Sequence, residues 1–171
     1  RCVFCHNEGR GDEYKKQFLS LDEVRRICTA AYSTGIKSFT FTGGEPLSNT
    51  NAQEIIRAIR SEFPDAILKM TSNIVLLKDE DIEFIGNNLD RIRINFQSTN
   101  REDFKEIIGV DRLDKLYHLI DLIKQTDVHI CLNYVYNELS QHLLPSIVEY
   151  ADKNNLEMKV LEMIKYPYNL S

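Results

Sequence analysis

Two cysteines near the start of the chain, Cys2 and Cys5, have the residue type and spacing of a metal-binding pair. Because they stand three positions apart, both sulfur atoms can reach a single metal centre. One interpretation is half of a zinc knuckle, but tetrahedral structural zinc needs four protein ligands and the sequence has no second close cysteine pair. His6 directly follows Cys5, which makes joint ligation awkward. The pair by itself is weak evidence for a metal site.

The other two cysteines, Cys28 and Cys131, are predicted to be packing residues. Cys28 lies on the apolar face of a predicted helix and Cys131 lies within a predicted strand. A free thiol in such a position behaves as a small hydrophobic side chain. We therefore do not expect them to bind the metal.

A second chemical feature is the stretch Gly43-Gly44-Glu45-Pro46, which directly follows a predicted strand. Glycines there allow a ligand to approach main-chain groups closely, at the strand end where α/β enzymes build active sites. Glu45 can accept a hydrogen bond from a ligand ammonium, and Pro46 stiffens the chain. The alternative is an ordinary strand-to-helix turn. The motif is neither a phosphate-binding loop nor a dinucleotide fingerprint.

The elements that position these residues alternate between strands and helices, as in parallel βα units. Strands are predicted at residues 38–42, 66–72, 91–96, 129–136 and 158–164. A capping box at Ser20 and Glu23 opens a first helix that Gly35 ends, and further helices are predicted at 51–63, 79–85, 103–108, 113–124 and 143–153. A partial (β/α) barrel explains this series best. A doubly wound open sheet is the alternative, because local pattern does not decide closure.

Three polar residues on these strands have two interpretations. Gln97, His129 and Asn133 lie at alternating positions, so they either point into the barrel or are satisfied polar groups at its core or rim.

The bulk properties are those of an ordinary globular domain. The 171 residues are 43% hydrophobic, which favours one core and one domain. The net charge of −5 gives no general attraction to nucleic acid or to an anionic membrane, and no apolar run approaches the roughly 20 residues that span a bilayer. The cysteine usage fits a reducing cytoplasm. Because the chain opens with Arg1, we interpret residues 1–171 as a core domain truncated at its N-terminal end, and leave truncation at the C-terminal end open.

Together, the cysteine pair, the aromatic Phe4 before Cys5 and the strand ending in Gly-Gly-Glu-Pro resemble the radical S-adenosylmethionine (radical SAM) superfamily. The usual pattern there is Cys-x-x-x-Cys-x-x-Cys. The resemblance makes Cys2 and Cys5 the second and third ligands of a 4Fe-4S cluster, with the first ligand upstream of Arg1. It also implies a partial (β/α)6 TIM-like barrel whose first strand lies upstream of the chain.

The resemblance further implies S-adenosyl-L-methionine as a cofactor, bound at the open iron of the cluster. Its reductive cleavage gives a 5′-deoxyadenosyl radical that abstracts hydrogen from the substrate. The implied cofactor-binding residues are Phe4, Gly43, Gly44, Glu45, Pro46, Ser72, Asn95 and Ile164. Phe4 would contact the adenosine, and Asn95 replaces a cofactor-contacting serine. Ile164 aligns with a methionine that flanks the adenine. The sequence identifies no catalytic residue.

The Ser72 assignment comes from Thr71-Ser72-Asn73, which is similar to a Thr-Ser/Thr-Asn-Gly turn of the family. Ile74 stands in place of the glycine. For Ser72 and Asn73, ordinary turn or capping chemistry is the alternative.

Within the superfamily, the chain is most similar to the GTP 3′,8-cyclase group of molybdenum-cofactor biosynthesis, through the segments 104–109, 132–133 and 161–163. However, Thr40 stands where that group usually has arginine, and Cys131 aligns with a lysine. Those cations serve a triphosphate, and neither replacement supplies the charge. We therefore favour a cyclase-like radical enzyme that acts on a peptide or a nucleoside-derived substrate.

Two alternatives stay open, the GTP cyclase itself and a non-catalytic metal-binding scaffold. The expected partners are a small-molecule or peptide substrate and an electron donor such as flavodoxin or ferredoxin. No membrane and no nucleic acid is expected.

Overall fold

The computed structural model describes residues 2 and 18–163, in which five strands form one parallel sheet in chain order. The strands are β1 (Ser38–Phe41), β2 (Ile67–Ser72), β3 (Arg91–Asn95), β4 (His129–Tyr136) and β5 (Glu157–Glu162). The helices are α1 (Leu21–Ser33), α2 (Ala52–Glu62), α3 (Ile82–Asn88), α4 (Arg101–Ile108), α5 (Leu113–Ile123) and α6 (Leu144–Lys153). Short 3-10 helices occupy Pro46–Ser48, Asp79–Asp81 and Gln141–Leu143. The predicted elements are therefore confirmed, with ends that differ by a few residues.

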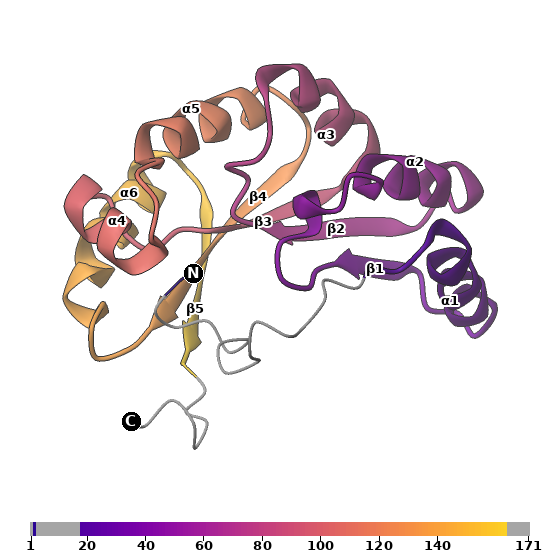
Figure 1. Ribbon diagram of the computed structural model, residues 1–171, viewed down its shortest axis with the longest axis horizontal. Helices are drawn as coiled ribbons and strands as arrows, with labels where there is room; N and C mark the ends of the chain where they lie inside the picture. Colours follow the sequence, from indigo (N-terminus) through magenta and orange to yellow (C-terminus); the bar gives the residue numbers. More distant parts are fainter. Residues whose placement is uncertain (1, 3–17, 164–171) are drawn as a thin grey trace.

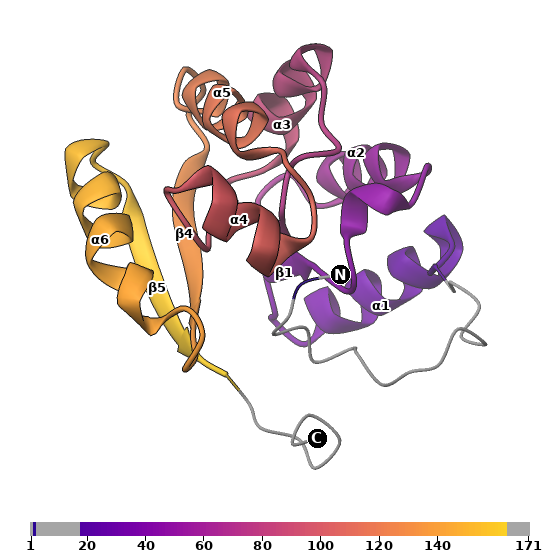
Figure 2. The ribbon, with the colours of Figure 1, turned by 60° about the vertical axis from the view of Figure 1, so that its left-hand side comes forward.

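The strand order distinguishes the two architectures that the sequence allowed. Each strand pairs with the next one along the chain, and the order never reverses. A doubly wound sheet reverses its order at a switch point, whereas successive right-handed crossovers without a reversal keep all helices on one side. Figure 1 shows the helices along the outer side of the sheet, and Figure 2 shows β1 with α1 at one end and β5 with α6 at the other. The α/β class with a partial, unclosed barrel is confirmed.

Side chains of the strands alternate between two faces. Ile92 and Ile94 of β3 face the helices and are fully buried, as are Leu68 and Met70 of β2. We call the opposite face of the sheet the inner face. Residues paired across a parallel ladder share a face, so the register assigns to the inner face Thr40, Lys69, Thr71, Arg91, Arg93, Asn95, His129, Cys131, Asn133, Glu157 and Lys159.

Three aromatic rings tie the end of β3 to the helices. Phe96 is fully buried and stacks on Tyr150 of α6, with ring centroids 4.8 Å apart and planes 13° apart. Its centroid lies 5.9 Å from that of Tyr117 on α5. Stacked and tilted aromatic pairs add to the free energy gained from burial alone. This cluster fixes the segment that follows Asn95.

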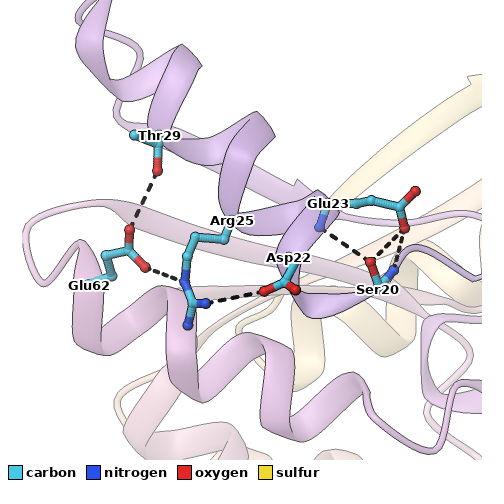
Figure 3. A network of polar contacts seen from close by, with 6 residues as sticks. All are labelled: Ser20, Asp22, Glu23, Arg25, Thr29 and Glu62. Atoms are coloured by element: carbon cyan, nitrogen blue, oxygen red, sulfur yellow. Dashed lines mark hydrogen bonds and ion pairs between the residues drawn. The ribbon is translucent and has the colours of Figure 1, made fainter.

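The predicted capping box opens α1 (Figure 3). The Ser20 hydroxyl accepts a hydrogen bond from the Glu23 amide, and the Glu23 carboxylate accepts one from the Ser20 amide at 2.8 Å. One turn later, Arg25 donates to Glu62 of α2 at 2.8 Å. The exposed Arg25–Glu62 ion pair contributes at most about 1 kcal/mol to the free energy of unfolding. Its main consequence is that it joins α1 to the neighbouring α2. Among the described residues, no helix is long and apolar enough to cross a membrane.

Replacing Phe96 by alanine is expected to lower the free energy of unfolding by about 3–5 kcal/mol, because the change leaves a cavity among fully buried rings. Urea unfolding of the purified protein measures it. Val148 is 40% exposed and gives the control, since Val148→Ala should change the unfolding free energy by less than about 0.5 kcal/mol. A loss below about 1 kcal/mol for Phe96→Ala would contradict the role of this cluster.

Candidate functional site

The glycine motif lies at the carboxyl end of β1, as the sequence predicts. Gly43 and Gly44 are exposed, and a Cβ atom added at either position would meet no atom of the described residues within 4 Å. Gly43 has φ +147°, which L side chains rarely adopt, so this position requires glycine. Open space therefore lies beside main-chain groups at the edge where parallel sheets bind ligands.

Glu45 links this motif to the end of β2. Its Oε1 accepts hydrogen bonds from the Ser72 hydroxyl at 2.7 Å and from the Leu47 amide at 3.1 Å. Its Oε2 accepts one from the Asn73 amide at 2.9 Å. A half-buried carboxylate with these donors is strongly fixed, since hydrogen bonds to charged groups are the stronger class. The structure thus gives Glu45 a positioning role, and its contact with a ligand ammonium stays a prediction.

The turn after β2 explains the serine and the asparagine. The Ser72 hydroxyl accepts a hydrogen bond from the Ile74 amide at 2.8 Å, and Asn73 Oδ1 accepts one from the Val75 amide at 3.1 Å. Ile74 has φ +53°, which is the left-handed region that favours glycine. Turn chemistry at Ser72 and Asn73 is therefore confirmed. Cofactor binding by Ser72 stays a prediction.

Two asparagines meet on the inner face near the carboxyl end of the sheet. Asn95 of β3 is half-buried and pairs in register with Asn133 of β4. Asn133 is only 5% exposed, and its buried Oδ1 has no hydrogen-bond partner in the part of the chain that the structure describes. Cofactor binding by Asn95 stays a prediction, whereas the unpaired acceptor of Asn133 is a group that a ligand can satisfy.

Gln97 and His129 do not join this group. The Gln97 side chain is fully buried and bonded, donating to the Asn133 carbonyl at 3.2 Å and accepting from the Val135 amide at 3.1 Å. It is a satisfied core residue. His129 begins β4, at the opposite end of the strand, where it lies 3.2 Å from Glu157. The structure therefore separates His129 from the glycine motif.

Arg93 was missed by the sequence reasoning. It lies in the middle of the inner face between its register partners Thr71 and Cys131, and its buried Nε has no hydrogen-bond partner within residues 2 and 18–163. The alternation of Arg91 and Arg93 with buried isoleucines was the available signal. It predicts two arginines on the same face of a strand, but does not show which one is paired.

The cysteines divide as predicted where the structure describes them. Cys28 is 4% exposed and Cys131 is 1% exposed. Burial raises the pKa of both thiols, with further raising by Glu62 near Cys28 and by Glu157 near Cys131. Both stay protonated at neutral pH, and a thiol ligand must be deprotonated. The interpretation of Cys28 and Cys131 as packing residues is confirmed.

Cys2 is half-buried and packs against the hydrophobic core. Its predicted co-ligand Cys5, together with Phe4 and Ile164, lies outside the described residues. Within residues 2 and 18–163, no three His, Cys, Asp or Glu side chains form a metal-binding group. A thiol at Cys2 that is not fully buried, and open space among the described residues at Gly43 and Gly44, are compatible with an iron-sulfur cluster bound by Cys2 and with a cofactor beside the glycines.

Comparison with known proteins agrees with this geometry. The family model described as the Radical SAM superfamily matches residues 1–137. Over 166 residues the chain is 28% identical to a protein named GTP 3′,8-cyclase from Clostridium perfringens, covering 96% of this chain and 51% of that protein. The chain spans about half the length of the curated relatives it matches.

Solved structures share the fold. The structure of Streptococcus suis SuiB bound to S-adenosylmethionine matches with a TM-score of 0.81 and 20% identity, covering 97% of this chain and 38% of that one. The structure of anSMEcpe with bound AdoMet and Kp18Cys peptide matches with a TM-score of 0.72 and 18% identity, covering 100% of this chain and 52% of that one.

Replacing Cys2 by alanine is expected to abolish iron binding, whereas Cys28→Ala and Cys131→Ala should retain it, because of these three only Cys2 has a side chain that is not fully buried. Iron per chain after anaerobic reconstitution measures this. Iodoacetamide at pH 8 should also modify the folded protein slowly at Cys28 and Cys131, since their raised pKa values leave little thiolate. Loss of iron in either core variant would contradict the assignment.

Glu45→Gln is expected to lower the free energy of unfolding by about 1–3 kcal/mol, because an amide replaces the carboxylate that accepts from Leu47, Ser72 and Asn73. Urea unfolding measures it. Ser72→Ala removes one of these hydrogen bonds and should lower the free energy of unfolding by less than Glu45→Gln does. The exposed Glu54 provides the matched control, and Glu54→Gln should change stability by less than about 0.5 kcal/mol. Equal effects at Glu45 and Glu54 would disprove the link between the strand ends.

Proposed function

Because the chain belongs to the radical SAM superfamily, we propose that residues 1–171 form the core domain of an enzyme that cleaves S-adenosyl-L-methionine reductively at a 4Fe-4S cluster. The radical so formed abstracts hydrogen from a peptide or a nucleoside-derived substrate. The observation that carries the proposal is the exposed Gly43-Gly44 main chain, held in place by Glu45 at the carboxyl edge of the sheet.

The superfamily uses both cofactors, and when bound the cluster supplies the electron that breaks the C–S bond of S-adenosyl-L-methionine. In this proposal Cys2 and Cys5 hold the cluster. The main chain of Gly43 and Gly44 binds the methionine part of the cofactor, and Glu45 keeps that main chain fixed through its bonds to Ser72 and Asn73. Such preorganisation reduces the entropy that the cofactor loses on binding.

The adenosine part of the cofactor is assigned to Phe4, Asn95 and Ile164. Phe4 and Ile164 contribute apolar contact, and Asn95 offers a half-buried amide on the inner face. The inner face is the surface available to a substrate, because among the described residues the helices cover the opposite side of the sheet.

The GTP 3′,8-cyclase reaction is the second candidate, because relatives such as the Clostridium perfringens protein have that name and align with 96% of this chain. Against it, Thr40 and Cys131 are neutral at two inner-face positions where the cyclase group has cations. For the peptide class, support comes from the anSMEcpe structure, which holds a Kp18Cys peptide together with AdoMet. A flavodoxin or ferredoxin is proposed as the electron donor. The scaffold alternative predicts no cofactor cleavage.

The test uses the full-length protein, reconstituted anaerobically with iron and sulfide and then reduced. The proposal expects an electron paramagnetic resonance signal of a reduced 4Fe-4S cluster that changes when S-adenosyl-L-methionine is added, and formation of 5′-deoxyadenosine. The Cys2→Ala variant is the negative control. A cluster that ignores the cofactor, or a protein without a cluster, would favour the scaffold. Adding GTP and analysing for a cyclised nucleotide separates the cyclase from other radical enzymes.

A further inference from the structure

We propose that Arg93 and Asn133 bind the substrate directly, with Arg93 holding a carboxylate or phosphate group and Asn133 Oδ1 accepting a hydrogen bond from a donor on the same molecule. The inference rests on the proposed function for the reaction and adds to it the chemical class of the substrate.

The first support is that each side chain has a buried polar atom without a hydrogen-bond partner among the described residues. Arg93 as a whole is half-buried, and this atom is its Nε donor. Asn133 is 5% exposed, and this atom is its Oδ1 acceptor. An unpaired buried polar atom costs free energy, and no ion pair of Arg93 exists among the described residues to compensate. One donor and one acceptor left open together indicate a ligand that supplies the complementary pair.

The second support is their placement. Arg93 pairs in register with Cys131, and Asn133 is two residues further along β4 toward the carboxyl end. From ordinary strand spacings, the two Cα atoms lie about 8 Å apart on the inner face. Long side chains can converge over that distance on one small molecule. Asn95, predicted to contact the cofactor, pairs directly with Asn133, so this ligand would adjoin the proposed cofactor position.

The third support is the charge on the inner face. The charge of Arg91 is partly neutralised by Glu157, whose carboxylate lies 3.6 Å from Arg91 and 3.2 Å from His129. Glu157 lies in the same row of the sheet as Arg93, as the register partner of Cys131, but it forms its ion pairs with Arg91 and His129. The neighbouring Cys131 does not neutralise Arg93, because burial raises the pKa of that thiol. Among the described residues, the middle of the inner face therefore retains a guanidinium without an ion-pair partner, which attracts a ligand anion.

The geometry of these groups restricts the chemical class of the ligand. A guanidinium matches the planar or tetrahedral oxygen pairs of carboxylate and phosphate. Asn133 Oδ1 only accepts, so it selects an N–H or O–H group on the same ligand.

The register also revises the interpretation, made from the sequence, that Thr40 and Cys131 leave the site without cations. Lys69 adjoins the neutral Thr40, and Arg93 adjoins the neutral Cys131, so cations are present one strand away from both replaced positions.

The test measures binding without turnover, by isothermal titration calorimetry on the full-length, cluster-loaded protein. β-Alanine carries a carboxylate and O-phosphoethanolamine carries a phosphate, each with an ammonium donor. Binding of either one to the wild type, weakened about 10- to 100-fold in Arg93→Gln and largely retained in Arg93→Lys, supports the proposal. The preferred probe distinguishes a carboxylate substrate from a phosphate substrate.

Two further variants and a stability measurement distinguish a role in ligand binding from a role in stabilising the fold. Asn133→Leu should weaken binding of the same probe, because it removes the acceptor. Arg91→Gln is the matched control and should leave binding unchanged, because that cation is engaged by Glu157. Urea unfolding should show Arg93→Gln to be at least as stable as the wild type, since no partner is lost; a structural role predicts a loss.

Absence of binding for both probes, or binding that Arg93→Gln leaves unchanged, would overturn the inference. Cofactor cleavage is measured separately through 5′-deoxyadenosine. A protein that binds the probe but cleaves no cofactor refutes the proposed function alone, and the reverse result refutes the binding site alone.

Discussion

Because the five strands pair in parallel and in chain order, their carboxyl ends lie along one edge and their helices lie on one side. The positions of Gly43, Glu45 and Asn95 depend on that constraint. It brings Gly43 to the same edge as the turn at Asn73, which is far away in sequence. It also leaves one face of the sheet free of the described helices. The Glu45 carboxylate then fixes the ends of β1 and β2 to each other through three hydrogen bonds. The proposed cofactor site at this edge therefore depends on the sheet topology and on one half-buried carboxylate.

The inner face divides into layers with different electrostatics. Toward the amino ends of the strands, Arg91 and His129 share the carboxylate of Glu157. In the middle, Arg93 lies beside neutral side chains, and toward the carboxyl ends lie Asn95 and Asn133. Among the described residues, the charges are paired at the amino end and Arg93 is left without an ion pair in the middle. This arrangement favours an anionic ligand near Arg93, since a half-buried cation without a partner attracts a counter-charge more strongly than a paired one.

Gly43 and Ile74, near the carboxyl edge of the sheet, both have a positive φ. The physical reason for the residue type differs between the two positions. At Gly43, φ is +147°, which only glycine adopts without strain. The position is exposed, so a larger side chain would gain no burial free energy to offset that strain. Ile74 accepts φ +53° although it is β-branched, because its side chain is fully buried. A left-handed conformation costs about 1–2 kcal/mol, whereas burial of an isoleucine contributes about 1.5–3 kcal/mol. Burial therefore outweighs backbone strain at Ile74, where the family resemblance led us to expect glycine.

The sequence by itself determined the features that depend on near neighbours. The Ser20 capping box, the alternation in β3, the turn chemistry of Ser72 and the burial of Cys28 are all set within a few residues, so they could be predicted. The roles of all the predicted cofactor-binding and cluster-binding residues stay predictions, and Phe4, Cys5 and Ile164 also lie outside the described residues. Tertiary structure alone decided which groups distant in sequence lie together. It brings Glu45 to Ser72 and Arg93 beside Cys131. It places His129 at the amino end of β4, away from the glycine motif. Strand register and long-range packing control those meetings, and neither is encoded in local periodicity.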